Sequence, residues 1–130
     1  MKEVYDFLKK CQTYFLATVE GNHPKVRPFG TIDIFEDKLY IQTGKVKEVS
    51  KQMQANPKIE ICALNEGQWI RISATAVRDD RVEAKQHMLD AYPSLQARYK
   101  ADDDNTEVLY LKDAVASFSS FTAEPKVIKF

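Results

Sequence analysis

The sequence lacks an excess of either charge and lacks any long apolar run. Nineteen Lys and Arg residues balance nineteen Asp and Glu residues in a chain of 130. Proteins that bind nucleic acid usually carry a basic excess, so this class is disfavoured. The longest weakly polar stretch, residues 114–123, has ten residues and three serines. A membrane span needs roughly 20 apolar residues, so we expect neither a nucleic-acid partner nor a membrane segment.

Cysteine and histidine are also scarce. Cys11 and Cys62 lack CxxC spacing, and the charged start of the chain lacks the apolar core of a signal peptide. These features predict free thiols in a reducing, cytoplasmic setting. His23 and His87 have no partner at zinc-ligand spacing, so a structural zinc site is not expected.

What remains is the composition of an ordinary globular protein. Hydrophobic residues make up 44% and charged residues 29% of the chain, which argues against disorder. The length corresponds to one domain, residues 1–130. No internal repeat or low-complexity segment interrupts it.

The hydrophobic pattern predicts a mainly β protein with small helices. Apolar residues at helical spacing predict helices over residues 3–11 and 45–55, and a capping box at residues 80–83 predicts a third helix that ends near residue 92. Six strands are expected, at residues 14–19, 25–35, 38–43, 58–64, 68–78 and 107–121. Because hairpin-length connections dominate, the sheet should be largely antiparallel and long enough to curl into a barrel.

The start of the expected helix 45–55 breaks a local rule. Thr43 is a plausible N-cap and Gly44 allows close approach, yet Lys45 and Lys47 crowd the positive end of the helix. Lysines there are unfavourable by several tenths of a kcal/mol. A bound anion such as phosphate would resolve the conflict. The alternative is a solvated lysine-rich face in which Glu48 pairs with a neighbouring lysine.

A second cationic segment lies upstream. In Lys25-Val26-Arg27 the cations alternate with an apolar residue, so both lie on one face of the expected strand. Arginine has a planar fork suited to bidentate phosphate contacts. If this strand lies beside the strand 38–43, the two cationic segments together would hold a single phosphate group.

The order of the motifs resembles the pyridoxamine 5′-phosphate oxidase-like family of FMN-binding split barrels. The resemblance extends over essentially the whole chain. It rests on Ala17-Thr18-Val19, Arg27-Pro28-Phe29-Gly30, Leu39-Tyr40-Ile41-Gln42-Thr43 with Lys47, Asn56-Pro57, and Trp69-Ile70-Arg71-Ile72-Ser73. It implies a six-stranded antiparallel split β-barrel with peripheral short helices, a homodimer, and FMN at the subunit interface.

The resemblance also implies a set of cofactor-binding residues. The segment Arg27–Gly30 would lie along the flavin, with its arginine on the phosphate. Thr43 and Lys47 match positions that complete the phosphate site, and Lys45 substitutes for part of a longer Ser/Arg/Lys cluster found in relatives.

Three aromatic residues complete the set that the resemblance implies. Trp69 falls where the family presents a residue to the cofactor from the partner subunit, and Phe118 and Phe121 lie in a strand that approaches the ring. Each has a structural alternative, as a core or interface anchor. Arg71 has one too, because it could pair with Glu60 across the strands.

The chain departs from the family at its end, and its function stays open. Residues 124–130 lack the arginine-rich segment that holds the substrate phosphate in vitamin B6 oxidases, so that activity is not expected. No serine or histidine has a nucleophile–base partner, so no catalytic residue is predicted. The candidates are an FMN-dependent oxidoreductase reduced by NAD(P)H, a non-catalytic protein that holds FMN, a deazaflavin, haem or another cofactor, and an interaction module without flavin.

Overall fold

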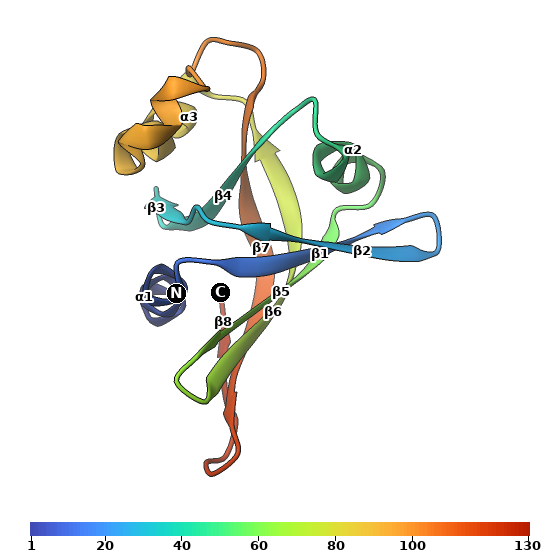
Figure 1. Cartoon of the computed structure of the whole chain (residues 1–130), viewed down its shortest axis with the longest axis vertical. Coiled ribbons are helices and arrows are strands. Elements are labelled where there is room, and N and C mark those ends of the chain that lie inside the picture. Colours follow the sequence, from blue (N-terminus) through green and yellow to red (C-terminus); the bar gives the residue numbers. More distant parts are fainter.

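The structure, a computed structural model, describes all 130 residues. Three α-helices lie around an eight-stranded antiparallel sheet (Figure 1). None of the helices combines the length and the hydropathy needed to cross a membrane. The helices are α1 (Lys2–Cys11), α2 (Glu48–Ala55), α3 (Val82–Ala91) and the 3₁₀ helix η1 (Pro93–Ala97). The strands are β1 (Tyr14–Glu20), β2 (His23–Phe29), β3 (Asp33–Phe35), β4 (Lys38–Gly44), β5 (Lys58–Asn65), β6 (Gln68–Asp79), β7 (Thr106–Ser120) and β8 (Lys126–Lys129).

The two edges of the sheet are connected at a seam between β2 and β3. Its strand order is β2-β1-β5-β6-β7-β4-β3, with β8 paired to β7. The two edge strands β2 and β3 are joined by only residues 30–32, which can reach about 14 Å at most. The linker keeps the end of β2 near the start of β3 without pairing the two strands, and the antiparallel sheet confirms the predicted mainly β class and is consistent with a split barrel.

Alternating apolar residues fill the barrel. In β6, Ile70, Ile72, Ala74 and Ala76 all point into a core of 22 buried residues, as the period-two pattern predicted. Helix α1 packs Val4 and Leu8 into this core, and its Phe7 ring meets Phe118 edge-on at a centroid distance of 5.4 Å. This packed core holds in place the ends of β2 and β4, which contribute residues to the functional site described below.

The number of strands is a correction to the sequence interpretation, which expected six. Residues 25–35 form two strands because β2 pairs with β1 whereas β3 pairs with β4, so the chain changes partner at residues 30–32. The chain end forms β8, which pairs with the second half of β7.

The predicted starts of the second and third of the three helices differ from the structure. Thr43 lies within β4 and is not an N-cap; α2 begins at Glu48 with Lys47 in the N-cap position. The intervening turn is held by Asn105 instead: Lys45 N donates to its backbone oxygen at 2.7 Å and Val46 N donates to its side chain at 3.2 Å.

The capping box at residues 80–83 does not form. The N-cap of α3 is Arg81, which makes no side-chain capping bond, and its backbone N–H donates to Asp79.

Tyr92 ties the seam together. Its hydroxyl accepts a hydrogen bond from Ile32 N at 3.0 Å and lies 3.1 Å from Ile32 O, to which it donates. We expect Tyr92→Phe to lower the free energy of unfolding by about 1–2 kcal/mol, because it leaves these backbone groups unpaired. Urea denaturation measures the loss. Tyr5→Phe is the control, since the Tyr5 hydroxyl makes no side-chain bond and its removal should change little; equal losses would refute the role of Tyr92.

Candidate functional site

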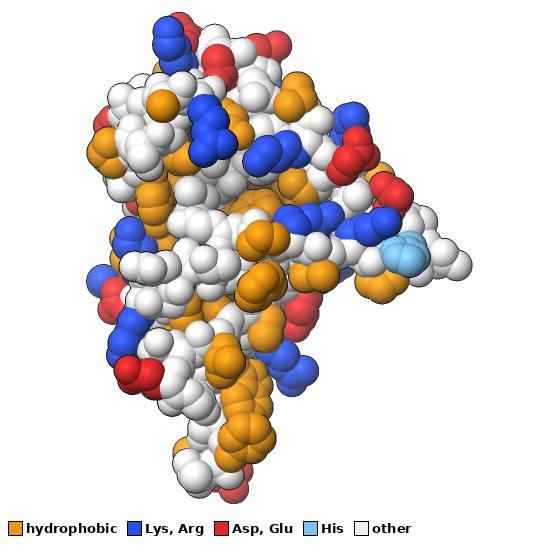
Figure 2. Space-filling view, in the orientation of Figure 1, with side chains coloured by type: hydrophobic (Ala, Val, Ile, Leu, Met, Phe, Trp, Pro, Cys, Tyr) orange, Lys and Arg blue, Asp and Glu red, His pale blue; other side chains and the backbone are white.

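A cleft of about 350 Å³ opens at the seam. The end of β2, the end of β4, the start of α2 and the segment from the end of α3 through η1 contribute its walls. In Figure 2, Lys and Arg side chains gather around a hydrophobic hollow on this face. The lining residues are Arg27, Pro28, Phe29, Gly30, Thr31, Gln42, Thr43, Lys47, Val49, Tyr92, Ser94, Leu95, Arg98 and Tyr99.

The lining carries positive charge without any acidic residue. Arg27, Lys47 and Arg98 contribute three cations, and no Asp or Glu is among the lining residues, although the chain as a whole is neutral. Such a one-sided wall creates a local positive potential that attracts an anionic ligand. The rest of the wall combines apolar and aromatic side chains with the polar residues Thr31, Gln42, Thr43 and Ser94, so the cleft is suited to a molecule that joins a flat ring to an anionic group.

The Arg27 guanidinium is held in place by neutral acceptors. Nη1 donates to Thr18 Oγ1 at 2.7 Å and to Leu16 O at 3.2 Å, while Nη2 donates to Gln52 Oε1 at 2.6 Å. No carboxylate lies within ion-pair distance, and burial lowers the pKa of Arg27. The charge is therefore pre-positioned and uncompensated, which favours binding of an anion.

Lys47 and Thr43 approach the same space from the other wall. Lys47 makes no ion pair and occupies the N-cap position of α2, where the helix dipole adds to its positive charge. Thr43 is 3% exposed at the end of β4 and supplies a hydroxyl group. Six of the residues singled out from the sequence line this cleft: Arg27, Pro28, Phe29, Gly30, Thr43 and Lys47.

Lys45 does not line the cleft. Its ammonium group lies 3.3 Å from the exposed carboxylate of Asp104, on the loop that precedes β7. Because α2 starts three residues later than the sequence predicted, Lys45 belongs to the preceding turn and not to the helix.

The three aromatic candidates also lie away from the cleft within one chain. Trp69 is the second residue of β6, next to the β5–β6 turn, and its ring contacts that of Phe121 at a centroid distance of 5.1 Å. Phe118 is a core residue, 4% exposed, as the structural alternative held. Phe121 is 91% exposed beyond the end of β7. Neither Trp69 nor Phe121 is among the residues that line the cleft.

Sequence reasoning missed one wall of the cleft. Ser94, Arg98 and Tyr99 come from η1 and the residues after it, a segment without periodicity or motif. Gly44 gives the only local signal for their approach, because a Cβ there would lie 3.1 Å from the Tyr99 hydroxyl. A glycine at the end of a strand can mark such a close contact.

A charged network anchors the start of the helical segment that carries this wall. Arg81 binds Asp79 at 2.9 Å and Glu36 at 2.7 Å, and the Tyr40 hydroxyl donates to Asp79 at 2.7 Å. Hydrogen bonds from Arg81 lower the pKa of Asp79 to about 2. The folded state therefore favours the ionised carboxylate.

This network gives the protein an acid-sensitive step. The stabilisation is present above pH 3.8, the ordinary pKa, and is lost as the pH falls toward about 2. Because Arg81 is partly exposed, we expect the step to be only about 1 kcal/mol. Unfolding of wild type and Asp79→Asn at pH values of about 5 and about 2.5 measures it. The variant should lose less stability on acidification than wild type; an identical loss would contradict the assignment.

The family comparison agrees with the sequence motifs. The profile described as pyridoxamine 5′-phosphate oxidase matches residues 1–128. No curated protein matches the chain. A solved NimC/NimA family protein from Clostridium acetobutylicum is 42% identical, with a TM-score of 0.97 over 100% of this chain and 92% of that chain.

More distant solved structures share the fold alone. General Stress Protein 26 from Bacillus anthracis is 15% identical, with a TM-score of 0.75 over 99% of this chain and 98% of that chain. A pyridoxamine 5′-phosphate oxidase-related, FMN binding protein from Nostoc punctiforme is 19% identical, with a TM-score of 0.64 over 97% and 90% of the two chains.

Proposed function

This chain belongs to the pyridoxamine 5′-phosphate oxidase family, and from that premise we propose that it is an FMN-binding flavoprotein that acts as an oxidoreductase on a small molecule. The observation that carries the proposal is the cleft wall with three cations and no acid beside an apolar surface. A fold relative whose name states that it binds FMN supports the choice of cofactor.

The residues of the cleft fit the two ends of FMN. Arg27, Lys47 and the Thr43 hydroxyl would hold the phosphate, since they supply charge-assisted hydrogen bonds from two separate strands and a helix start. Pro28, Phe29 and Gly30 would lie along the flavin as the floor of the cleft.

FMN supplies the redox chemistry when bound, and the protein supplies its position and its surroundings. Arg27 fixes the phosphate because Thr18 and Gln52 already hold its guanidinium, so little freedom is lost on binding. Tyr92 and Leu95 line the cleft and would cover part of the flavin ring. NAD(P)H is the proposed reductant, and a small organic molecule the acceptor.

Vitamin B6 oxidation is not part of the proposal. Residues 124–130, which include β8, contain no arginine, so this segment does not match the arginine-rich motif of vitamin B6 oxidases. We also propose a reducing, cytoplasmic location for the protein, because Cys11 and Cys62 are both free thiols.

A homodimer also belongs to the proposal. Figure 2 shows a band of hydrophobic side chains that runs from the hollow toward the lower tip of the molecule. Cross-strand register places Phe15 beside Cys62 and Leu64 beside Trp69 on one sheet face, and Phe15 and Leu64 are 49% and 68% exposed. A second copy that covers this face would carry its own Trp69 toward the flavin.

A non-catalytic cofactor-binding protein is the second candidate. Haem receives less support than flavin, because no His, Cys or Met lines the cleft and tyrosine is the only common axial ligand there.

Two readings of the purified protein test the proposal. Mass spectrometry of the small molecules released on denaturation should detect FMN, and anaerobic NAD(P)H should bleach the yellow absorption of the bound flavin. If FMN is detected but NAD(P)H does not bleach its absorption, the protein binds flavin without being reduced by NAD(P)H. That result would contradict the oxidoreductase proposal. A colourless protein that does not quench the fluorescence of added FMN would overturn the flavin site itself.

A further inference from the structure

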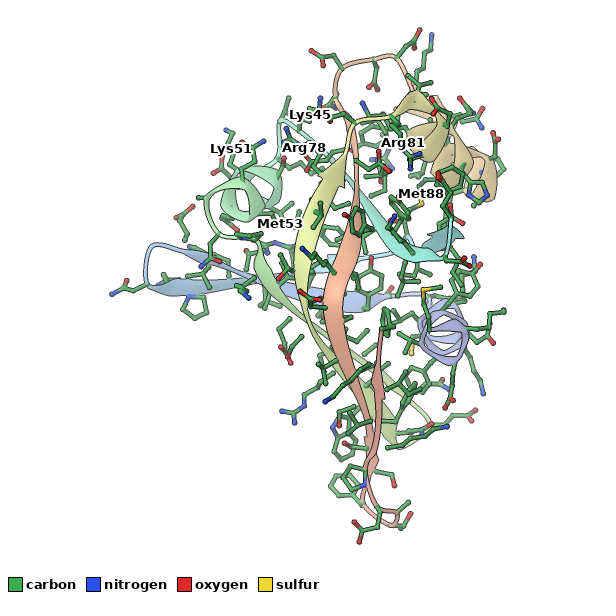
Figure 3. The ribbon with its side chains drawn as sticks, turned by 180° about the vertical axis from the view of Figure 1, so that it is seen from behind. Lys45, Lys51, Met53, Arg78, Arg81 and Met88 are labelled. Carbon is green, nitrogen blue, oxygen red and sulfur yellow. The ribbon has the colours of Figure 1, made fainter.

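The Arg27 guanidinium is connected to helix α2 by the buried side chain of Gln52, which is 5% exposed. Thr18 and Glu20 lie two positions apart on β1 and so share one face of the sheet. Strand pairing places Arg27 opposite Leu16, on the same face. Figure 3 shows from behind that α2 lies next to the β1–β2 hairpin. Side chains from β1, β2 and α2 therefore meet at one point.

The contacts of Gln52 fix the orientation of its amide group. Its Oε1 accepts from Thr18 Oγ1 and from Arg27 Nη2, both at 2.6 Å, and its Nε2 donates to Glu20 Oε2 at 3.1 Å. In the flipped orientation, the amide N–H groups would face the guanidinium and the carbonyl would face the carboxylate. A neutral amide thus bridges a cation and an acid that form no ion pair with each other.

These contacts leave part of Arg27 available to a ligand. A guanidinium has five N–H donors, and Leu16 O, Thr18 Oγ1 and Gln52 Oε1 each accept one. The Nε–H and one N–H of Nη2 remain, on a side chain that lines the cleft. A carboxylate in place of the Gln52 amide would form an ion pair with the guanidinium and would neutralise its charge.

We infer that Gln52 is a positioning residue that keeps the positive charge of Arg27 available to the phosphate of the flavin nucleotide. Its amide holds the guanidinium in place without neutralising it, and separates it from Glu20. The inference rests on the proposed function for the identity of the ligand. The charge itself acts on any phosphate that enters the cleft, so inorganic phosphate is a probe that does not depend on flavin.

Gln52→Glu changes the charge of this side chain and preserves its shape. Because the new carboxylate pairs with Arg27, we expect the preference for FMN over riboflavin and the affinity for inorganic phosphate to fall at least about tenfold. Riboflavin affinity should change by less than about threefold, since riboflavin has no phosphate. Fluorescence titration with each flavin and NMR titration with inorganic phosphate measure these changes.

Gln54→Glu is the matched control. It is the same substitution on the same helix, but Gln54 is exposed and does not line the cleft. It should leave both the flavin preference and the phosphate affinity within about twofold of wild type. An equal loss in Gln54→Glu and Gln52→Glu would show that only the net charge of the protein matters, and would overturn the inference.

The exchange variant Glu20→Gln/Gln52→Glu separates neutralisation of Arg27 from repulsion between two carboxylates. It has the net charge of wild type and restores a hydrogen bond between positions 20 and 52, but it keeps a carboxylate beside the guanidinium. We expect the same loss of FMN preference as in Gln52→Glu, with a melting temperature equal to or above that of wild type, because a charge-assisted bond replaces a neutral one. A purely structural role of Gln52 predicts instead that the exchange restores the wild-type preference.

The possible results distinguish this inference from the flavin proposal. If wild type binds inorganic phosphate but not FMN, and Gln52→Glu loses the phosphate, the flavin proposal fails and the role of Gln52 holds. If wild type prefers FMN and the exchange variant retains that preference, the role of Gln52 is overturned and the flavin proposal stands. A wild type that binds neither ligand contradicts both, because Arg27 would then offer no available charge.

Discussion

The double variant Arg27→Ala/Lys47→Ala should bind FMN roughly 10²- to 10⁴-fold more weakly than wild type. Each charge-assisted contact to a phosphate contributes about 1.5–3 kcal/mol, so the loss of two corresponds to about 3–6 kcal/mol. Both residues line the same cleft, and neither has an acidic partner that would compete for its charge. Fluorescence titration with FMN measures the change.

Lys45→Ala is the matched control for this variant. Lys45 is close in sequence to Lys47 and carries the same charge, but it pairs with Asp104 outside the cleft. Its removal should change FMN affinity by less than about threefold. Folding of the double variant should persist, because Lys47 is exposed and Arg27 is only partly buried. Wild-type affinity in the double variant would show that the phosphate lies elsewhere.

The largest change in assembly is expected from Phe15→Glu/Leu64→Glu. Wild type should sediment at twice the chain mass of 14.9 kDa, and the variant at the mass of one chain, because two carboxylates would be placed in the apolar face. The variant should also lose FMN, since the partner subunit completes the proposed site. Sedimentation equilibrium combined with flavin absorbance reads both effects in one experiment.

Val82→Glu is the control for assembly. Val82 is 53% exposed on α3, comparable to the other two positions, but it lies outside the apolar sheet face. This variant should remain a dimer that retains FMN. A monomeric wild type, or a double variant that remains dimeric, would refute the proposed interface.

The sequence predicted the elements whose signal is local. Alternation identified β6 and its inward residues Ile70 and Ile72, and helical spacing identified α1. The break in residues 25–35 could not be read in this way, because it arises where the chain changes its pairing partner from β1 to β4. The residues before and after this change of partner both have the composition typical of strands.

The residues of the candidate site likewise divide into those that have a local sequence signal and those that do not. Lys47 was found because a lysine conflicts with the positive end of the expected helix. Arg27 was found because the cations alternate with an apolar residue in the expected strand. Lys45 was misplaced because Asn105, about sixty positions away in the chain, holds the turn that precedes α2. Arg98 was missed because its place in the cleft depends on how η1 packs, and no spacing in the sequence encodes that contact.

Comparison of FMN with riboflavin tests the phosphate site most directly, because the two molecules share the ring and differ by the phosphate. The wild-type protein should bind FMN at least about 100-fold more tightly, and Arg27→Ala/Lys47→Ala should nearly abolish that preference. Equal affinity of the wild-type protein for FMN and riboflavin would contradict the account, because the cationic wall would then make no contribution to binding.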